Sequence, residues 1–225
     1  MSEIAAFFDL DGTLYEGYLG EALTRYHVEN RVNRRQVLRY ALASYPLYFL
    51  HKAGLYDYEK AYYAWGANLA WLVRGMTRPE ADALWHWILH KKHLPHLRPE
   101  MKEALTYHQQ NRHLVVLVSG SFVPYVEMFA AEMGATDYIA TPLEFVEGRY
   151  TGEIIPPLNV GDGKLQRIHA FLDAHHGEID LAQSYFYTDS VVDAPVMELV
   201  GKPVAVYPDD GLRTLATERA WEIIG

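Results

Sequence analysis

Residues that could do chemistry gather directly after the short apolar runs of this sequence, and a lysine at the start of a predicted helix joins them. They comprise four aspartates, one lysine, three hydroxyl residues and a glycine: Asp9, Asp11, Asp189, Asp193, Lys164, Thr13, Ser119, Ser121 and Gly120. If the apolar runs are strands of one parallel sheet, their carboxyl ends bring these residues into one crevice. Open α/β sheets bind their ligands at that place.

A group of four carboxylates in one crevice needs a counter-charge. Two carboxylates about 4 Å apart repel by roughly 4 kcal/mol at an effective dielectric of about 20, and Lys164 alone cannot balance four of them. A hard divalent cation with oxygen ligands answers this need, and Mg²⁺ is the usual choice where a phosphate supplies another ligand. A phosphoryl group also suits the lysine, the hydroxyls and the loop amides, which donate to its oxygens.

The elements that must position these residues follow an α/β pattern. Short apolar runs at residues 4–8, 114–118, 138–140, 185–187 and 203–207 are typical of buried strands. Helical periodicity separates most of them, around residues 100–110, 123–133, 164–174 and 212–220. This alternation predicts a doubly wound, mostly parallel sheet covered by helices.

Residues 15–95 interrupt the alternation, because they show only helical periodicity and no convincing strand. An excursion of this length is too long for a simple crossover between strands. We therefore predict a helical cap domain at residues 15–95, inserted into an α/β core of residues 1–14 and 96–225. Residues 142–155 carry Gly148 between two short extended runs and predict a hairpin.

The composition limits the classes of function. The chain has 225 residues, a formal net charge of −9 and no cysteine. The negative charge argues against a nucleic-acid binder, and without cysteine there are no disulfides or thiolate metal sites. The first apolar run stops at Asp9 and no segment reaches the roughly 20 apolar residues of a spanning helix, so we expect a cytoplasmic protein without a signal peptide or transmembrane segment. The oligomeric state is left open.

Four short motifs, taken in order, resemble those of the haloacid dehalogenase superfamily. They are Asp9-Leu10-Asp11-Gly12-Thr13-Leu14, Val118-Ser119-Gly120-Ser121, Gly163-Lys164 and Thr188-Asp189-Ser190-Val191-Val192-Asp193. A helical cap between the first two motifs makes the chain similar to the phosphoserine-phosphatase-like group, subfamily IB. The resemblance implies a Rossmann-like core and a Mg²⁺-dependent phosphomonoester hydrolase that acts on a small phosphorylated metabolite. It covers the core nearly end to end and is weakest over the cap.

The resemblance also implies a role for each carboxylate. Asp9 would attack phosphorus and form an aspartyl-phosphate, and Asp11 would protonate the leaving oxygen and then deprotonate the attacking water. Mg²⁺ would be held by Asp9, Asp189 and the backbone carbonyl of Asp11. Asp193 would bind the metal through water or orient Lys164.

The phosphoryl oxygens would be held by Ser119, Gly120 and Lys164 through a loose transition state. Thr13 is expected to close its loop by hydrogen bonding rather than to touch substrate. Substrate selection is open at this stage, and Glu16, Tyr18 and Glu21 are candidates to line the crevice because they follow the first motif.

Two other hypotheses fit the same sequence. A phosphotransferase would pass the aspartyl-phosphate to an acceptor other than water, and the motifs do not separate it from a hydrolase. A non-catalytic binding protein on this fold would act through the aromatic residues of the cap.

Three histidines, His86, His90 and His93, have the helical spacing that can build a zinc site. No carboxylate accompanies them and Pro95 interrupts the run, so we expect solvated histidines.

Overall fold

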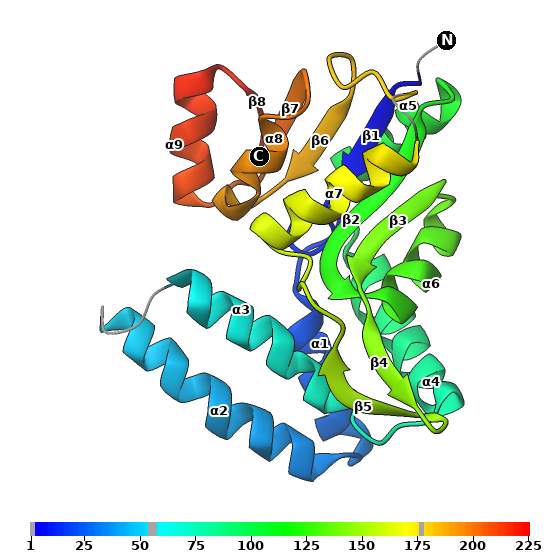
Figure 1. Cartoon of the computed structure of the whole chain (residues 1–225), viewed down its shortest axis with the longest axis vertical. Coiled ribbons are helices and arrows are strands. Elements are labelled where there is room, and N and C mark those ends of the chain that lie inside the picture. Colours follow the sequence, from blue (N-terminus) through cyan, green and yellow to red (C-terminus); the bar gives the residue numbers. More distant parts are fainter. Residues whose placement is uncertain (1–2, 54–57, 176–177) are drawn as a thin grey trace.

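A parallel sheet forms the centre of the molecule (Figure 1). The computed structural model describes residues 3–53, 58–175 and 178–225. Its six-stranded sheet has the order β3-β2-β1-β6-β7-β8, and each neighbouring pair is parallel. The strands are β1 (Ala5–Phe8), β2 (Leu114–Phe122), β3 (Asp137–Thr141), β6 (Tyr185–Thr188), β7 (Lys202–Val206) and β8 (Glu222–Ile224). This confirms the predicted doubly wound sheet, in which the winding direction reverses between β1 and β6.

Helices cover both faces of this sheet, and residues that alternate along β1 enter opposite cores. Phe8 packs into the cluster with Leu117 and Phe129, whereas Phe7 packs with Val116 and Phe186. Because both faces are covered, the strands are apolar on both sides, which produces the continuous apolar runs of the sequence. The core helices are α5 (Pro99–Gln110), α6 (Val123–Met133), α7 (Asp162–Ala174), α8 (Ala194–Met197) and α9 (Asp210–Arg219).

Two strands differ from the prediction. β8 was not predicted, because its three residues at a partly exposed sheet edge are too few to show a period. β2 continues past Val118 to Phe122, with a register shift between these two residues. The serines predicted to follow β2 therefore lie inside its irregular end.

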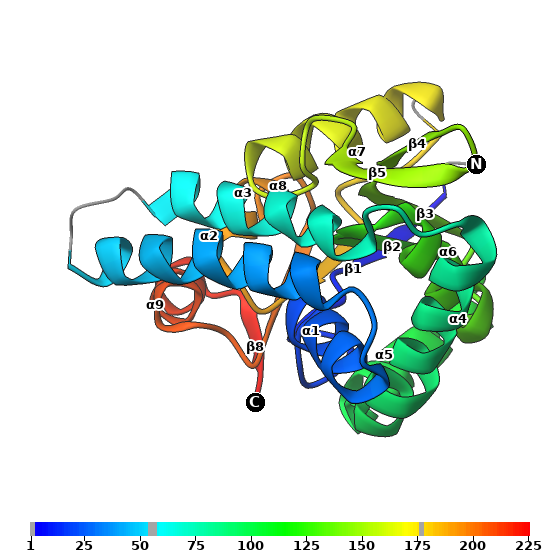
Figure 2. The same cartoon turned by 90° about the horizontal axis from the view of Figure 1, so that it is seen from below.

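The described part of residues 15–95 has helices, joined by turns, as its regular elements. Its helices are α1 (Leu19–Asn30), α2 (Arg34–Lys52), α3 (Tyr58–Leu69) and α4 (Arg78–Ile88), followed by a π-helical turn at Leu89–His93. Helices α2 and α3 lie side by side and project from the body (Figure 2). Trp85 of α4 packs its ring near Phe122 and Tyr125, so one hydrophobic cluster crosses the predicted boundary at residues 95 and 96. The division into cap and core stays a prediction.

The predicted hairpin consists of β4 (Leu143–Val146) and β5 (Arg149–Ile154). Glu147 and Gly148 connect the two strands with φ values of 49° and 78°, which suits the type I′ turn of a two-residue loop. Backbone hydrogen bonds attach the hairpin to the helical segment, from Gly75 N to Tyr150 O at 2.7 Å and from Tyr150 N to Met76 O at 2.9 Å.

The expectation of solvated histidines is wrong for His93. The π-helical turn changes the phase of the helix there, and His93 is buried with its ring stacked on Tyr15 at 3.9 Å and hydrogen-bonded to the hydroxyl of Tyr125. Burial lowers the pKa of His93 to about 3.

Within the described residues, no helix combines the length and apolar character needed to cross a membrane.

A second buried histidine, His27, predicts a loss of stability in acid. Burial lowers the pKa of His27 from 6.5 to about 4, so the unfolded chain binds a proton that the folded chain refuses. The resulting stability is present above about pH 6.5 and is lost toward pH 4, at up to about 1.4 kcal/mol per pH unit. Urea unfolding at neutral pH and at about pH 5 should show a smaller loss for His27→Leu than for the parent chain. The exposed His86→Leu is the control, and an unchanged pH dependence in His27→Leu would refute this origin.

Candidate active site

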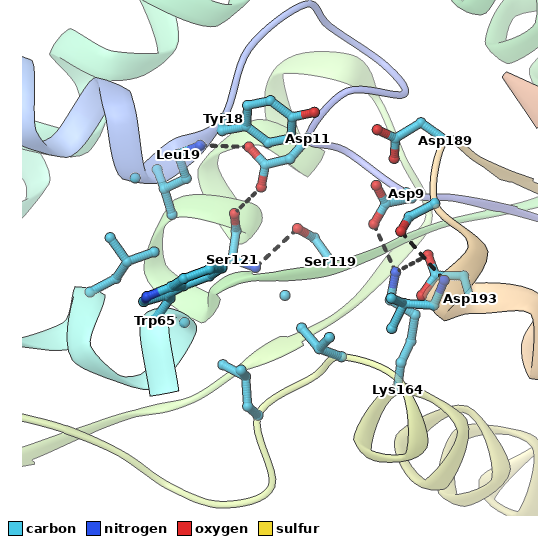
Figure 3. Close-up of a pocket in the computed structure, with 18 of the residues that line it drawn as sticks. Asp9, Asp11, Tyr18, Leu19, Trp65, Ser119, Ser121, Lys164, Asp189 and Asp193 are labelled. Atoms are coloured by element: carbon cyan, nitrogen blue, oxygen red, sulfur yellow. Dashed lines mark hydrogen bonds and ion pairs between the residues drawn. The ribbon is translucent and has the colours of Figure 1, made fainter. Parts of the chain in front are cut away.

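The carboxyl ends of the central strands open into a cavity of about 430 Å³ (Figure 3). The residues predicted to carry chemistry line this cavity, with the exception of Thr13. These lining residues are Asp9, Asp11, Ser119, Gly120, Lys164, Asp189 and Asp193. Thr13 is fully buried beside the cavity, where its hydroxyl lies 3.3 Å from Asp9 Oδ2 and 3.4 Å from Asp189 Oδ1. The structure therefore brings together residues that are up to 184 positions apart, since Asp9 and Asp193 meet at one ammonium group.

Lys164 is the centre of this cluster. Its Nζ donates to Asp9 Oδ1 at 2.8 Å and to Asp193 Oδ2 at 2.6 Å, and Thr188 Oγ1 donates to the same Asp193 oxygen at 2.7 Å. Burial alone would lower the pKa of Lys164, but the carboxylates of Asp193 and Asp9 outweigh it and raise that pKa. Lys164 is thus a buried, charged group that orients the Asp9 carboxylate.

Two glycines permit this close assembly. A Cβ on Gly163 would lie 2.0 Å from Leu158 O, so only glycine lets α7 begin where Lys164 reaches the cluster. Gly12 has a φ of +78°, and a Cβ there would lie 2.1 Å from Asp189 Oδ2. The loop after β1 can therefore run directly against the carboxylate of Asp189.

The cluster holds more negative charge than its lysine balances. Burial, together with the neighbouring charges of Asp193 and Asp189, raises the pKa of Asp9 to about 8 against the lowering effect of Lys164. Burial and the charge of Asp193 raise the pKa of Asp189 to about 7. For both groups burial is the largest cause, and repulsion between the neighbouring carboxylates adds to it.

This donor set suits a hard cation. In the described part of the chain, no three carboxyl or imidazole side chains form a ready-made metal cluster. The predicted ligands are fewer, namely the carboxylates of Asp9 and Asp189 and the backbone carbonyl of Asp11. Mg²⁺ matches such a set, because it commonly binds through one or two carboxylates and completes its shell with substrate phosphate and water.

Asp11 is held apart from the lysine by three donors. Its Oδ1 accepts hydrogen bonds from Tyr15 Oη and Leu19 N, both at 2.7 Å, and its Oδ2 accepts one from Ser121 Oγ at 2.7 Å. Burial raises the pKa of Asp11, and these hydrogen bonds oppose the rise. The two aspartates of the first motif therefore have different surroundings, as their two predicted roles would require.

Sequence reasoning gave neither Tyr15 nor Ser121 a role at Asp11. Tyr15 is the first residue of the predicted cap. The one sequence signal for its contact with Asp11 is a hydroxyl group four residues after that aspartate. Asn159 was also missed, although its Nδ2 donates to Ser119 O at 2.7 Å and to Ile139 O at 3.0 Å. It fixes the irregular end of β2 that carries the serines.

Of the three candidates for substrate selection, one lines the cavity and two do not. Tyr18 lines the cavity, whereas Glu16 and Glu21 are exposed and lie outside its lining. Leu19 and Gly20 face the cavity from the first turn of α1, and a helix turns by about 100° per residue, which takes Glu21 away from it. Other lining residues were not named individually as candidates for this role: Trp65, Gly66, Leu69, Phe122, Leu158, Val160, Val192 and Asp209.

Comparison with known proteins shows which family the chain belongs to. The family model for haloacid dehalogenase-like hydrolases matches residues 6–198. A protein of Mycobacterium tuberculosis named phosphoserine phosphatase SerB1 is 30% identical over 223 residues, which cover 97% of this chain and 70% of that protein. A solved structure of a Bordetella pertussis protein covers 100% of this chain and 99% of its own, with a TM-score of 0.83 and 26% identity.

A more distant solved structure shares the fold. It is a phosphoserine phosphatase solved as a phospho-aspartyl intermediate analogue, with a TM-score of 0.66 and 16% identity over 100% of this chain and 94% of that one. The chain belongs to the haloacid dehalogenase-like hydrolases. Within that family it is a phosphatase, which favours the enzymatic hypothesis over that of a non-catalytic binding protein.

The buried lysine cluster predicts a strong coupling. Lys164→Met should destabilise the fold by about 3 kcal/mol at neutral pH, because it leaves two buried carboxylates without their counter-charge. The same substitution should cost at least about 1 kcal/mol less in an Asp193→Asn background. Urea unfolding of the four proteins in this cycle measures the coupling, with the exposed Lys102→Met as control. Additive effects would contradict the assigned role of the ion pairs.

Proposed function

We propose that this phosphatase hydrolyses small phosphomonoesters through an aspartyl-phosphate on Asp9, with Mg²⁺ as cofactor. The observation that carries the proposal is the hydrogen bond of 2.8 Å between Lys164 Nζ and Asp9 Oδ1 at the carboxyl edge of the sheet. It leaves the second carboxylate oxygen of Asp9 available to the cavity, apart from a long contact of 3.3 Å from the hydroxyl of Thr13. That oxygen can attack a phosphorus atom.

In the first half of the reaction, the Asp9 oxygen bonds to phosphorus while the bond from phosphorus to the leaving oxygen breaks. Lys164, the Ser119 hydroxyl and the Gly120 backbone stabilise the equatorial phosphoryl oxygens through the loose transition state. All three groups line the cavity together with Asp9. Asp11 gives its proton to the leaving oxygen, so that the product departs as an alcohol.

In the second half, Asp11 takes a proton from water, which attacks phosphorus and releases Asp9 and inorganic phosphate. The burial that raises the pKa of Asp11 supports this exchange of a proton. The hydrogen bonds from Tyr15 and Ser121 would aim the carboxyl group at the cavity. No feature in the described part of the chain selects an acceptor other than water, so hydrolysis is proposed rather than phosphotransfer.

Mg²⁺ would be held by Asp9, Asp189 and the backbone carbonyl of Asp11, and when bound it would neutralise the charge of the cluster and of the phosphoryl group. The excess of buried carboxylates over Lys164 supports this assignment. Residues 15–95 would act as a cap over a core of residues 1–14 and 96–225, because α1 and α3 contribute side chains to the same cavity.

Loss of the nucleophile gives the direct test. Asp9→Asn should reduce the hydrolysis of p-nitrophenyl phosphate by about a thousandfold or more, because an amide cannot form the acyl-phosphate. Release of p-nitrophenol measures turnover. The exposed Asp173→Asn makes the same chemical change far from the site and should retain activity. Comparable turnover in Asp9→Asn and the parent chain would exclude this mechanism.

The metal assignment has a test that does not depend on turnover. Mg²⁺ at a hundredfold excess over its Kd should stabilise the folded chain by about 2.7 kcal/mol. This stabilisation should be lost in Asp189→Asn and retained in Asp173→Asn, as measured by thermal unfolding with and without Mg²⁺. Equal stabilisation of Asp189→Asn and the parent chain would rule out Asp189 as a ligand.

A further inference from the structure

The cavity has two chemically different ends. Its polar end contains Lys164 and the aspartates, and its other end is apolar. The apolar side chains of this other end include Leu19, Trp65, Leu69, Phe122 and Leu158. Figure 3 shows Trp65 across the cavity from Lys164, on a helix that differs from the one that carries the lysine. A substrate that places its phosphoryl group beside Asp9 would therefore extend its leaving group along the apolar wall.

Two glycines allow the side chains of the apolar wall to pack closely against the helices. On α3, a Cβ on Gly66 would lie 2.6 Å from Leu158 Cδ2, and on α1 a Cβ on Gly20 would lie 3.0 Å from Leu69 Cδ2. These leucines therefore lie directly against the helix backbones. Trp65 donates its indole N–H to Ser44 O at 3.0 Å, outside the cavity lining, so the part of Trp65 that faces the cavity is its ring.

The positive charge that lines the cavity is already paired with carboxylates of the protein. Among the described lining residues, Lys164 is the one cationic side chain, and five aspartates accompany it. Its Nζ is bonded to Asp9 and Asp193. A carboxylate on the leaving group would thus be buried against apolar side chains without a counter-charge, which is strongly unfavourable.

We propose that the site selects monophosphate esters of alcohols that have an aromatic or otherwise apolar body and carry no carboxylate. This inference rests on the proposed function, in which the alcohol leaves with the proton of Asp11 and the phosphate leaves with an oxygen from water. Phosphoserine lies outside this class, although a relative of this chain carries the name phosphoserine phosphatase. The walls of the cavity, rather than that likeness, carry the assignment.

A matched pair of esters tests the proposal. Benzyl phosphate and 4-carboxybenzyl phosphate have the same scissile bond and nearly the same size, and they differ in one carboxylate. The parent enzyme with Mg²⁺ should show a kcat/KM for benzyl phosphate at least about tenfold above that for its carboxylated analogue and for phosphoserine. Equal or reversed values would overturn the inference while leaving the phosphatase proposal intact.

Two variants locate the selectivity in the wall. Trp65→Ala should raise the KM for benzyl phosphate by about tenfold with little change for ethyl phosphate, whereas Trp65→Phe should resemble the parent chain. Leu69→Arg places a cation in the wall and should shift the preference toward 4-carboxybenzyl phosphate. An unchanged ratio of the two benzyl esters in Leu69→Arg would contradict the inference. Absence of turnover for every ester, including p-nitrophenyl phosphate, would instead overturn the proposed function, and the inference with it.

Discussion

The buried ion pairs of Lys164 with Asp9 and Asp193 are the constraint on which the rest of the site depends. They join the helix after the hairpin, the loop after β1 and the turn after β6 at one ammonium group. A lone lysine or a lone aspartate at this depth would be strongly destabilising. Gly163 is tied to the same constraint, because a Cβ there would collide with the backbone carbonyl of Leu158 and displace the helix that carries Lys164.

In the proposed mechanism, the reacting groups and the residues that select the leaving group come from different parts of the fold. The chemical groups come from the strand ends on either side of the reversal between β1 and β6, where a rigid sheet fixes their spacing. The apolar wall comes largely from α1, α3 and the loop before α7. The sequence of the helices can vary while the strand ends stay in place. Membership of the family therefore indicates the class of reaction, whereas the identity of the leaving group has to be inferred from the apolar wall of this chain.

The strand-end residues could be predicted from sequence because each stands at a fixed offset from an apolar run, and the sheet supplies the proximity. Tyr15, Asn159 and Trp65 could not, since their contacts depend on how the helical segment and the loop before α7 pack. His93 is a clear case, because an ordinary helix predicts a solvated ring and the π-helical turn buries it. The short edge strand β8 has too few residues to give a periodic signal.

In the proposed reaction, Asp9 carries the phosphoryl group. The most direct measurement is to mix the enzyme with a ³²P-labelled phosphomonoester and Mg²⁺, quench in acid during turnover, and map the labelled peptide by mass spectrometry. We expect a label on Asp9 that is sensitive to hydroxylamine, as acyl-phosphates are, and absent from Asp9→Asn. Rapid turnover without a labelled peptide, or a label on another residue, would contradict it.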